Sequence, residues 1–218
     1  MAFTLQNEVQ ALKQQLLTLA AMVEENVQHA VKALLERDGD LAQRVVKCDD
    51  QVNRLEVDLE EECLKVLALH QPVANDLRTI IGIIKINNDL ERIADQAVNI
   101  SERALAVIEL PTVDSPLELA IMSVKVIDML EKSLDSLVNA NVTLARKVLE
   151  LDEDVDQIHS DNYRLFKASV RSNPERIDVL LNYLTASRHL ERVADLATNI
   201  AEDVIYLTEG EIVRHTVA

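Results

Sequence analysis

The stretch Leu90–Ile100 reads LERIADQAVNI, and the chain repeats it at Leu190–Ile200 as LERVADLATNI. Eight of the eleven positions are identical, at a constant offset of 100 residues. In both stretches the apolar residues recur at steps of three and four, which is the spacing of an amphipathic helix. The two stretches therefore predict that the chain contains two copies of one helical unit.

A shorter match extends the repeat towards the N-terminus. The segment Asp49–Asn53 aligns with Asp152–Asp156 at an offset of 103, so the two copies differ only by small slips in spacing. Prolines bracket an extended segment near residues 109–116, between the copies. We predict a tandem repeat whose first unit covers residues 1–110 and whose second covers residues 111–218, each long enough to carry its own core.

Residues that interrupt helices are rare and lie between the periodic segments. The 218 residues include three Gly and four Pro, and Asn173 before Pro174 predicts an N-cap and first position for the last helix. Tyr and Phe together number five and Trp is absent, which excludes a β-sandwich or barrel. The predicted fold class is all-α: two three-helix bundles in tandem, with six long antiparallel helices at about 3–37, 40–70, 72–108, 116–141, 143–172 and 174–209.

The chain is strongly acidic, with 38 Asp and Glu against 22 Lys and Arg and a net charge of −16. This charge repels phosphates and anionic lipids, so we expect no nucleic-acid partner and no direct membrane insertion. The longest nearly apolar stretch, 16–23, is too short to span a bilayer, and the first residues do not resemble a signal peptide. Because Cys48 and Cys63 form no Cys-x-x-Cys pair, we expect a reduced, cytoplasmic setting.

Some of the acids form a row beside the apolar stripe of the predicted helices. At about 100° per residue, Glu91 and Asp95 lie about 40° apart on the shoulder of one helix. The preceding helix carries Asp49 and Asn53 in the same position relative to its own stripe. If these two helices fold back on each other at Gln71–Pro72, residues equidistant from the turn lie side by side. We therefore expect Asp49 and Asn53 to face Glu91 and Asp95.

The second half repeats this construction. Folding the chain at Asn173–Pro174 brings Asp152 and Asp156 towards Glu191 and Asp195. Two acidic pairs on neighbouring helices are thus predicted to converge twice in one chain.

Convergent acids repel each other, and the sequence offers two remedies. Like charges four residues apart cost an isolated helix about 0.2–0.5 kcal/mol, and opposing two such pairs adds to this cost. Hard cations such as Mg²⁺, Mn²⁺, Ca²⁺ or iron suit carboxylate oxygens and would offset the repulsion. Solvation of the rows, together with the adjacent Arg92 and Arg192, is the alternative, and it would leave a metal-free structural protein.

The histidines argue against an oxidase. Ferritin-like di-iron proteins use Glu-x-x-His on two helices, and this motif does not occur here. The nearest match is Asp156-x-x-His159, whose counterpart in the first half is Glu56, so His159 is either a secondary ligand or a solvated residue. His189, whose counterpart is Asp89, is a further candidate. A di-metal carboxylate protein stays an alternative, but no phosphate loop, nucleophile elbow or zinc motif is present. We predict no catalytic residues and no enzyme.

Three segments resemble the PhoU family. They are Gln71–Arg78 (QPVANDLR), Asp89–Asp95 (DLERIAD) and its echo His189–Asp195 (HLERVAD). The likeness covers nearly the whole chain, including Asp49–Asn53 and Asp152–Asp156. It implies two similar three-helix bundles, in agreement with the periodicity.

The resemblance also implies metal sites. Members of the family bind multinuclear clusters of divalent or trivalent metal through paired acid-x-x-x-Asp motifs, with iron or zinc expected and manganese, magnesium or calcium as alternatives. Asn53 stands where an Asp is expected, so we predict that the second site binds metal more strongly. Carried over by position, the ligands are Asp49, Asn53, Glu91 and Asp95 in the first half, and Asp152, Asp156, Glu191 and Asp195 in the second.

The role implied by the resemblance is that of a cytoplasmic accessory regulator of phosphate uptake. Such a protein contacts the ATPase subunit of the phosphate ABC transporter and a sensor histidine kinase, and represses the phosphate-starvation response. It is then peripheral to the inner membrane through its protein partners. Long amphipathic helices are also compatible with a homodimer.

Overall fold

A computed structural model describes residues 2–213, with side chains from residue 5 onward, and helices are the regular secondary structure of this part of the chain. The predicted fold class is confirmed, and no predicted helix end differs from the observed end by more than three residues. The boundary after residue 110 stays a prediction, and residue 1 and residues 214–218 lie outside the described range. The helices are α1 (Ala2–Glu36), α2 (Gly39–His70), α3 (Ala74–Ile108), α4 (Leu119–Asn139), α5 (Val142–Ser172), the 3₁₀ turn η1 (Pro174–Arg176) and α6 (Ile177–Glu209).

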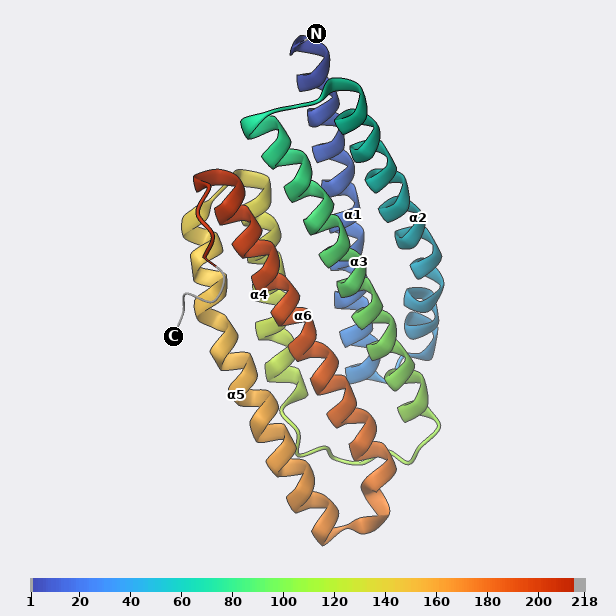
Figure 1. Cartoon of the computed structure of the whole chain (residues 1–218). Helices are drawn as coiled ribbons and strands as arrows, with labels where there is room; N and C mark the ends of the chain where they lie inside the picture. The colour runs from blue at the N-terminus through green and yellow to red at the C-terminus, as the bar shows by residue number, and fades with distance from the viewer. Residues whose placement is uncertain (1, 214–218) are drawn as a thin grey trace.

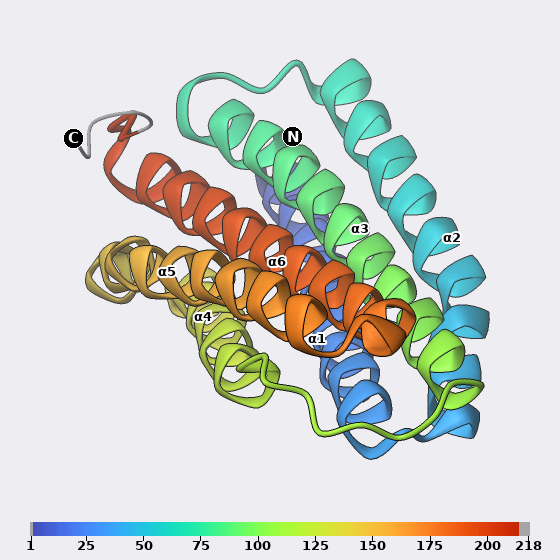
Figure 2. The same ribbon diagram turned by 90° about the horizontal axis from the view of Figure 1, so that it is seen from below.

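The helices form two bundles that lie side by side. Helices α1, α2 and α3 pack on one another, and α4, α5 and α6 do the same. In Figure 1 and Figure 2, α3 and α6 run antiparallel in the centre, with α2 beside α3 and α5 beside α6. Helices α1 and α4 lie on the other side of this row of four and contact each other. Each half is therefore a three-helix bundle, and the halves meet mainly through α3 and α6 and also through α1 and α4.

The apolar stripes identified in the sequence form the core. Leu90 and Ile100 on α3, and Leu190 and Ile200 on α6, all have 0% of their surface exposed. Burying one such side chain stabilises the fold by about 1.5–3 kcal/mol. Within residues 2–213 no helix is long and apolar enough to cross a membrane.

The ends of the helices follow local hydrogen bonding, with one correction. Asp38 and Asn141 cap α2 and α5, each accepting a bond from the backbone N–H three residues on, at 2.9 and 3.1 Å. The prediction that Asn173 caps the last helix was wrong, since its side chain makes no capping bond. The residue before a proline is held out of the helical region, and residues 174–176 form a separate 3₁₀ turn. Helix α6 begins only at Ile177.

The interface between the halves is close-packed. Gly82 on α3 lies against Leu207 on α6, and a Cβ atom at this position would come within 2.4 Å of the Leu207 side chain. Elsewhere along the same pair of helices, Nδ1 of His189 donates to Oε1 of Gln96 at 2.9 Å. His189 is therefore part of the contact between the halves.

Candidate metal centres

The tightest cluster of potential metal ligands lies between α5 and α6. Asp152 and Asp156 on α5 and Asp195 on α6 each place one carboxylate oxygen within 4.8 Å of the other two. Across residues 2–213, this is the one group of Asp, Glu, His or Cys side chains that converges so closely. In the second half, the acids of α5 therefore face an acid of α6, as predicted. We call this group, together with Glu191, the second seam.

Buried neighbours hold these acids at the edge of the helix pair. Val155 lies between the two α5 acids in sequence and is 0% exposed, and Ala194, which precedes Asp195, is 1% exposed. Because these apolar residues pack inward, the carboxylates beside them are placed on the shoulder of the contact. Asp152 is half-buried, and the other two acids of the trio are exposed.

The second seam is electrostatically unfavourable without a cation. Burial, followed by repulsion from Asp156, Asp195 and Glu191, raises the pKa of Asp152 to about 6. Burial and the charges of Glu191 and Asp156 also raise the pKa of Asp195. Oδ1 of Asp152 is buried and accepts no hydrogen bond from any described residue. A set of oxygen donors with one buried oxygen lacking a partner fits a hard cation.

Glu191 lies at the margin of the trio. Its Oε2 is 3.7 Å from Nε2 of His159 on α5, and 29% of its side-chain surface is exposed. It still acts on the trio, because its charge contributes to the raised pKa of Asp152 and of Asp195.

The corresponding first seam lies between α2 and α3 and contains Asp49, Asn53, Glu91 and Asp95. Burial, then the charge of Asp95, raises the pKa of Asp49, whose Oδ1 is buried and unpartnered among the described residues. The pKa of Glu91 is raised by burial and then by Asp95, Glu56 and Asp49. The three acids of the first seam therefore act on one another across the two helices.

Asn53 changes the chemistry of the first seam. Its Nδ2 donates to Oδ2 of Asp49 at 3.0 Å, and this bond opposes the rise in the pKa of Asp49. The amide thus occupies a carboxylate oxygen that a cation would otherwise use.

Glu56 lies beside the first seam and acts on Glu91, although the sequence did not select it as a ligand. Its pKa is raised by burial and by Glu60, and Asn87 on α3 donates to its backbone oxygen at 2.9 Å and to Oε1 at 3.3 Å. Glu56 aligns with His159 in the repeat at an offset of 103, and this alignment could have identified Glu56 as a candidate ligand.

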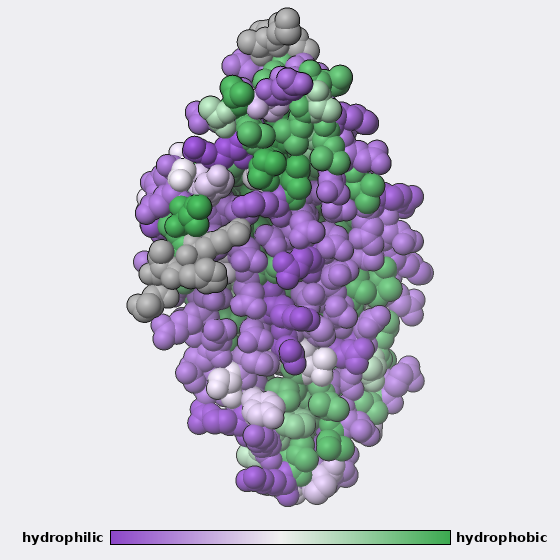
Figure 3. All heavy atoms as spheres, viewed as in Figure 1, coloured by the Kyte–Doolittle hydropathy of each residue, from purple (hydrophilic) through white to green (hydrophobic). Residues whose placement is uncertain are grey.

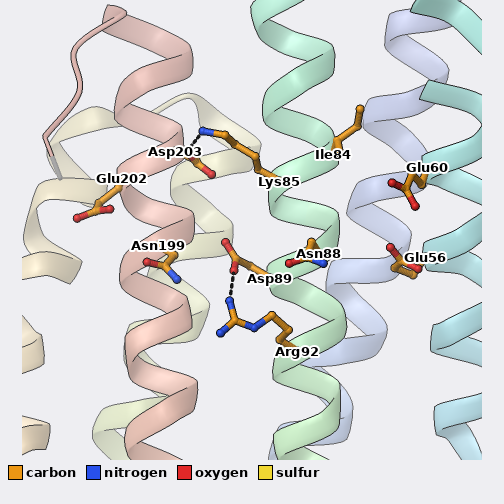
Figure 4. Close-up of a pocket in the computed structure, with 10 residues that line it drawn as sticks. All are labelled: Glu56, Glu60, Ile84, Lys85, Asn88, Asp89, Arg92, Asn199, Glu202 and Asp203. Atoms are coloured by element: carbon orange, nitrogen blue, oxygen red, sulfur yellow. Dashed lines mark hydrogen bonds and ion pairs between the residues drawn. The ribbon is translucent and has the colours of Figure 1, made fainter. Parts of the chain in front are cut away.

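A groove of about 630 Å³ lies beside the first seam, between α2, α3 and α6. Glu56 and Glu60 line one side (Figure 4). Its two cationic side chains are already paired. Nζ of Lys85 is 3.2 Å from Asp203, and Nη1 of Arg92 is 3.3 Å from Asp89. The groove therefore offers an anion little unpaired positive charge.

Fold and seams together define a class of protein: a tandem repeat of two three-helix bundles, each with one row of opposed acids between its second and third helices. Comparison with known proteins identifies the family. The family model "PhoU domain" matches residues 16–104 and again residues 119–204, one match in each predicted half. The chain belongs to the PhoU family.

Individual relatives and solved structures support the same family assignment. The chain is 40% identical over 208 residues to "Phosphate-specific transport system accessory protein PhoU homolog" of Aquifex aeolicus, covering 95% of this chain and 94% of that protein. It is 32% identical over 210 residues to "Phosphate-specific transport system accessory protein PhoU" of Escherichia coli K12, covering 95% and 86%. The crystal structure of PhoU from Pseudomonas aeruginosa superposes with a TM-score of 0.91 at 38% identity, covering 94% of this chain and 99% of that one.

Proposed function

We propose that this protein is a metal-binding regulator of phosphate uptake and of phosphate-starvation signalling. The observation that carries the metal-binding part is the buried Oδ1 of Asp152, unpartnered among the described residues, beside Asp156 and Asp195. The phosphate part rests on family membership, because the relatives are named for phosphate-specific transport.

Each seam would hold a multinuclear cluster of divalent or trivalent metal. Membership of the family leads us to propose iron or zinc, and the preference of oxygen donors for hard cations gives manganese, magnesium and calcium as alternatives. A bound cluster would neutralise the repelling acids and cross-link the two helices of its seam. The residues that would hold it are Asp49, Asn53, Glu91 and Asp95 in the first seam, and Asp152, Asp156, Glu191 and Asp195 in the second.

The protein would act as an adaptor and negative regulator, in contact with the ATPase subunit of the phosphate ABC transporter and with a sensor histidine kinase. Its net charge of −16 favours association with basic faces of such partners. Figure 3 shows a largely hydrophilic face with apolar surface at its upper end and again near its lower end. At the start of α3, Val73 is 76% exposed and Leu77 is 40% exposed. We propose a cytoplasmic location at the inner membrane through these partners, and assembly as a homodimer.

Deleting the gene and following a phosphate-starvation reporter tests the regulatory role. We expect the reporter to be active in phosphate-rich medium in the deletion strain, and a plasmid copy of the gene to silence it. A reporter that stays silent in the deletion strain would overturn the regulatory proposal.

The role of the metal is tested separately. We expect a variant with Asp152, Asp156, Glu191 and Asp195 all replaced by Ala to lose second-seam metal in elemental analysis and to fail to silence the reporter. Equal, sub-stoichiometric metal in both proteins would leave a metal-free structural adaptor, the alternative that solvation of the acids predicts.

A further inference from the structure

We propose that His159 is an additional ligand of the second seam, and that its nitrogen gives this seam a preference for transition metals such as Zn²⁺ which the first seam lacks. The inference rests on the metal-binding function proposed above. It concerns a residue outside the acid-x-x-x-Asp pairs.

The imidazole of His159 is directed at the second seam. It lies on α5, three residues after Asp156, and its Nε2 is 3.7 Å from Oε2 of Glu191 on α6. Two donor atoms about 2.1 Å from one ion can be at most about 4.2 Å apart, so a single ion can reach both atoms. The side chain of His159 is 22% exposed, which leaves room for a ligand at the seam but little freedom for the ring.

A buried hydrogen-bond network fixes the other side of the ring. Nδ1 of His159 is 2.9 Å from Oγ of Ser187, which is 0% exposed. Asn162, also 0% exposed, donates to the same Oγ at 3.1 Å, and its Oδ1 accepts from the backbone N–H of Glu118 at 2.7 Å. The Ser187 hydroxyl in turn donates to the sulfur of Met122 at 3.2 Å.

These contacts are compatible with the tautomer that metal binding at Nε2 requires. With its own proton directed at the sulfur, Oγ of Ser187 has two lone pairs, which accept from Asn162 and from Nδ1–H of His159. The proton then sits on Nδ1, and the lone pair of Nε2 points towards Glu191. A second hydrogen bond of this kind orients most metal-binding histidines.

The repeat shows that this arrangement is specific to the second half. The counterpart of His159 is Glu56, and the counterpart of Ser187 is Asn87. Asn87 donates to Oε1 of Glu56 at 3.3 Å, so each half pairs the seam residue with a matching partner on the neighbouring helix. The residue at this position and its partner therefore both differ between the halves: carboxylate and amide in the first, imidazole and hydroxyl in the second.

The exchange alters which ions each seam favours. The first seam offers oxygen donors only, which suit Mg²⁺, Ca²⁺ and Mn²⁺. One imidazole nitrogen among oxygens shifts the preference of the second seam towards Zn²⁺, iron, nickel or copper.

The direct test observes the nitrogen. Protein labelled with [¹⁵N]histidine is titrated with Zn²⁺ and followed by long-range ¹H–¹⁵N correlation, in a background with Glu91→Ala and Asp95→Ala so that the second seam is isolated. We expect the Nε2 signal of His159, assigned by its loss in His159→Gln, to shift at one equivalent. His29, on α1 with 40% of its side chain exposed, serves as control, and His29→Gln should leave the shift unchanged.

Calorimetry in the same background gives the energetic test. We expect His159→Glu to lower Zn²⁺ affinity at least about 10-fold while Mn²⁺ affinity is kept or raised, and Ser187→Ala to lower Zn²⁺ affinity about 10-fold. Circular dichroism checks that each variant folds.

Two failures are distinguishable. If Zn²⁺ binds, and binding requires Asp152 and Asp195 but leaves His159 unshifted, the imidazole is only an ion-pair partner of Glu191 and the inference is overturned while metal binding stands. If the protein binds neither Zn²⁺ nor Mn²⁺, the proposed metal-binding function itself is wrong.

Discussion

Asn53 and Asp156 occupy the same place in the two halves, on the shoulder of α2 and of α5, but their side chains interact differently with the neighbouring acids. Asp156 contributes an oxygen to a trio within 4.8 Å, whereas Asn53 donates a hydrogen bond to Asp49 at 3.0 Å. One seam therefore accumulates repulsion that a cation could offset, and the other has already relieved part of it internally. The difference shows that the two copies of the repeat can share their packing while a single amide in place of a carboxylate changes the site.

The largest effect is expected from the shared core. Leu90→Ala and Leu190→Ala each remove a fully buried side chain and should lower the free energy of unfolding by about 2–5 kcal/mol. Urea unfolding of the two variants measures this. Because the halves pack through α3 and α6, we expect one transition in both cases. Two separate transitions would mean that the bundles unfold independently.

The second prediction addresses the seams directly. Asp195→Ala removes one of three convergent oxygens and should weaken Zn²⁺ binding at the second seam by about 100-fold, measured by calorimetry. The matched change Asp95→Ala in the first seam should have a smaller effect, since Asn53 already occupies an oxygen of Asp49. Equal losses for the two variants would contradict the proposed difference between the seams.

The third prediction exchanges the residue types at positions 53 and 156, so that each seam takes on the acid or amide of the other. Asn53→Asp should raise metal affinity at the first seam about 10-fold, because it adds an oxygen donor and removes the competing hydrogen bond. The reciprocal Asp156→Asn should lower affinity at the second seam. Titration of both variants with Mn²⁺ tests this, and unchanged affinities would show that residues 53 and 156 are not ligands.

The smallest effect concerns pH in chelator-treated protein. The pKa of Asp152 is raised in the folded state to about 6 from 3.8. Its protonated form is thus favoured by folding, and this contribution is present below pH 3.8 and lost as the pH rises through about 6. Asp152→Asn should therefore stabilise the metal-free protein at pH 7 by about 1 kcal/mol, allowing for solvent screening.

Urea unfolding between pH 4 and pH 7 gives the measurement, with the exposed Glu153→Gln as the control. If Glu153→Gln stabilised the protein as much as Asp152→Asn does, the effect would come from the change in net charge alone.

The sequence predicted most of the fold because its signals are local. The repeated stripe around Leu90 and Leu190 fixes which faces are buried, and prolines mark where helices stop. The start of α6 was predicted three residues early, because competition between an Asn173 cap and a 3₁₀ turn depends on the path of the preceding helix.

The candidate site was predicted less completely. Symmetry about each turn correctly brought Asp152 and Asp156 to Asp195, since it uses only helix geometry. The orientation of His159 depends on Ser187, which is 28 residues away, and helical spacing carries no information about such a contact. The packing of Gly82 on Leu207 could not be predicted from the helical spacing either, because this contact joins the two repeats.

That last contact has a mechanical consequence. Because Gly82 has no side chain, the Leu207 side chain of α6 packs directly against α3, and this contact opposes sliding of one bundle past the other. The segment that connects the halves in sequence is itself held in place, since Leu117 is 7% exposed and the backbone N–H of Glu118 donates to Asn162 at 2.7 Å. Any side chain added at Gly82 would therefore have to displace Leu207, and it would loosen the contact that holds the two bundles together.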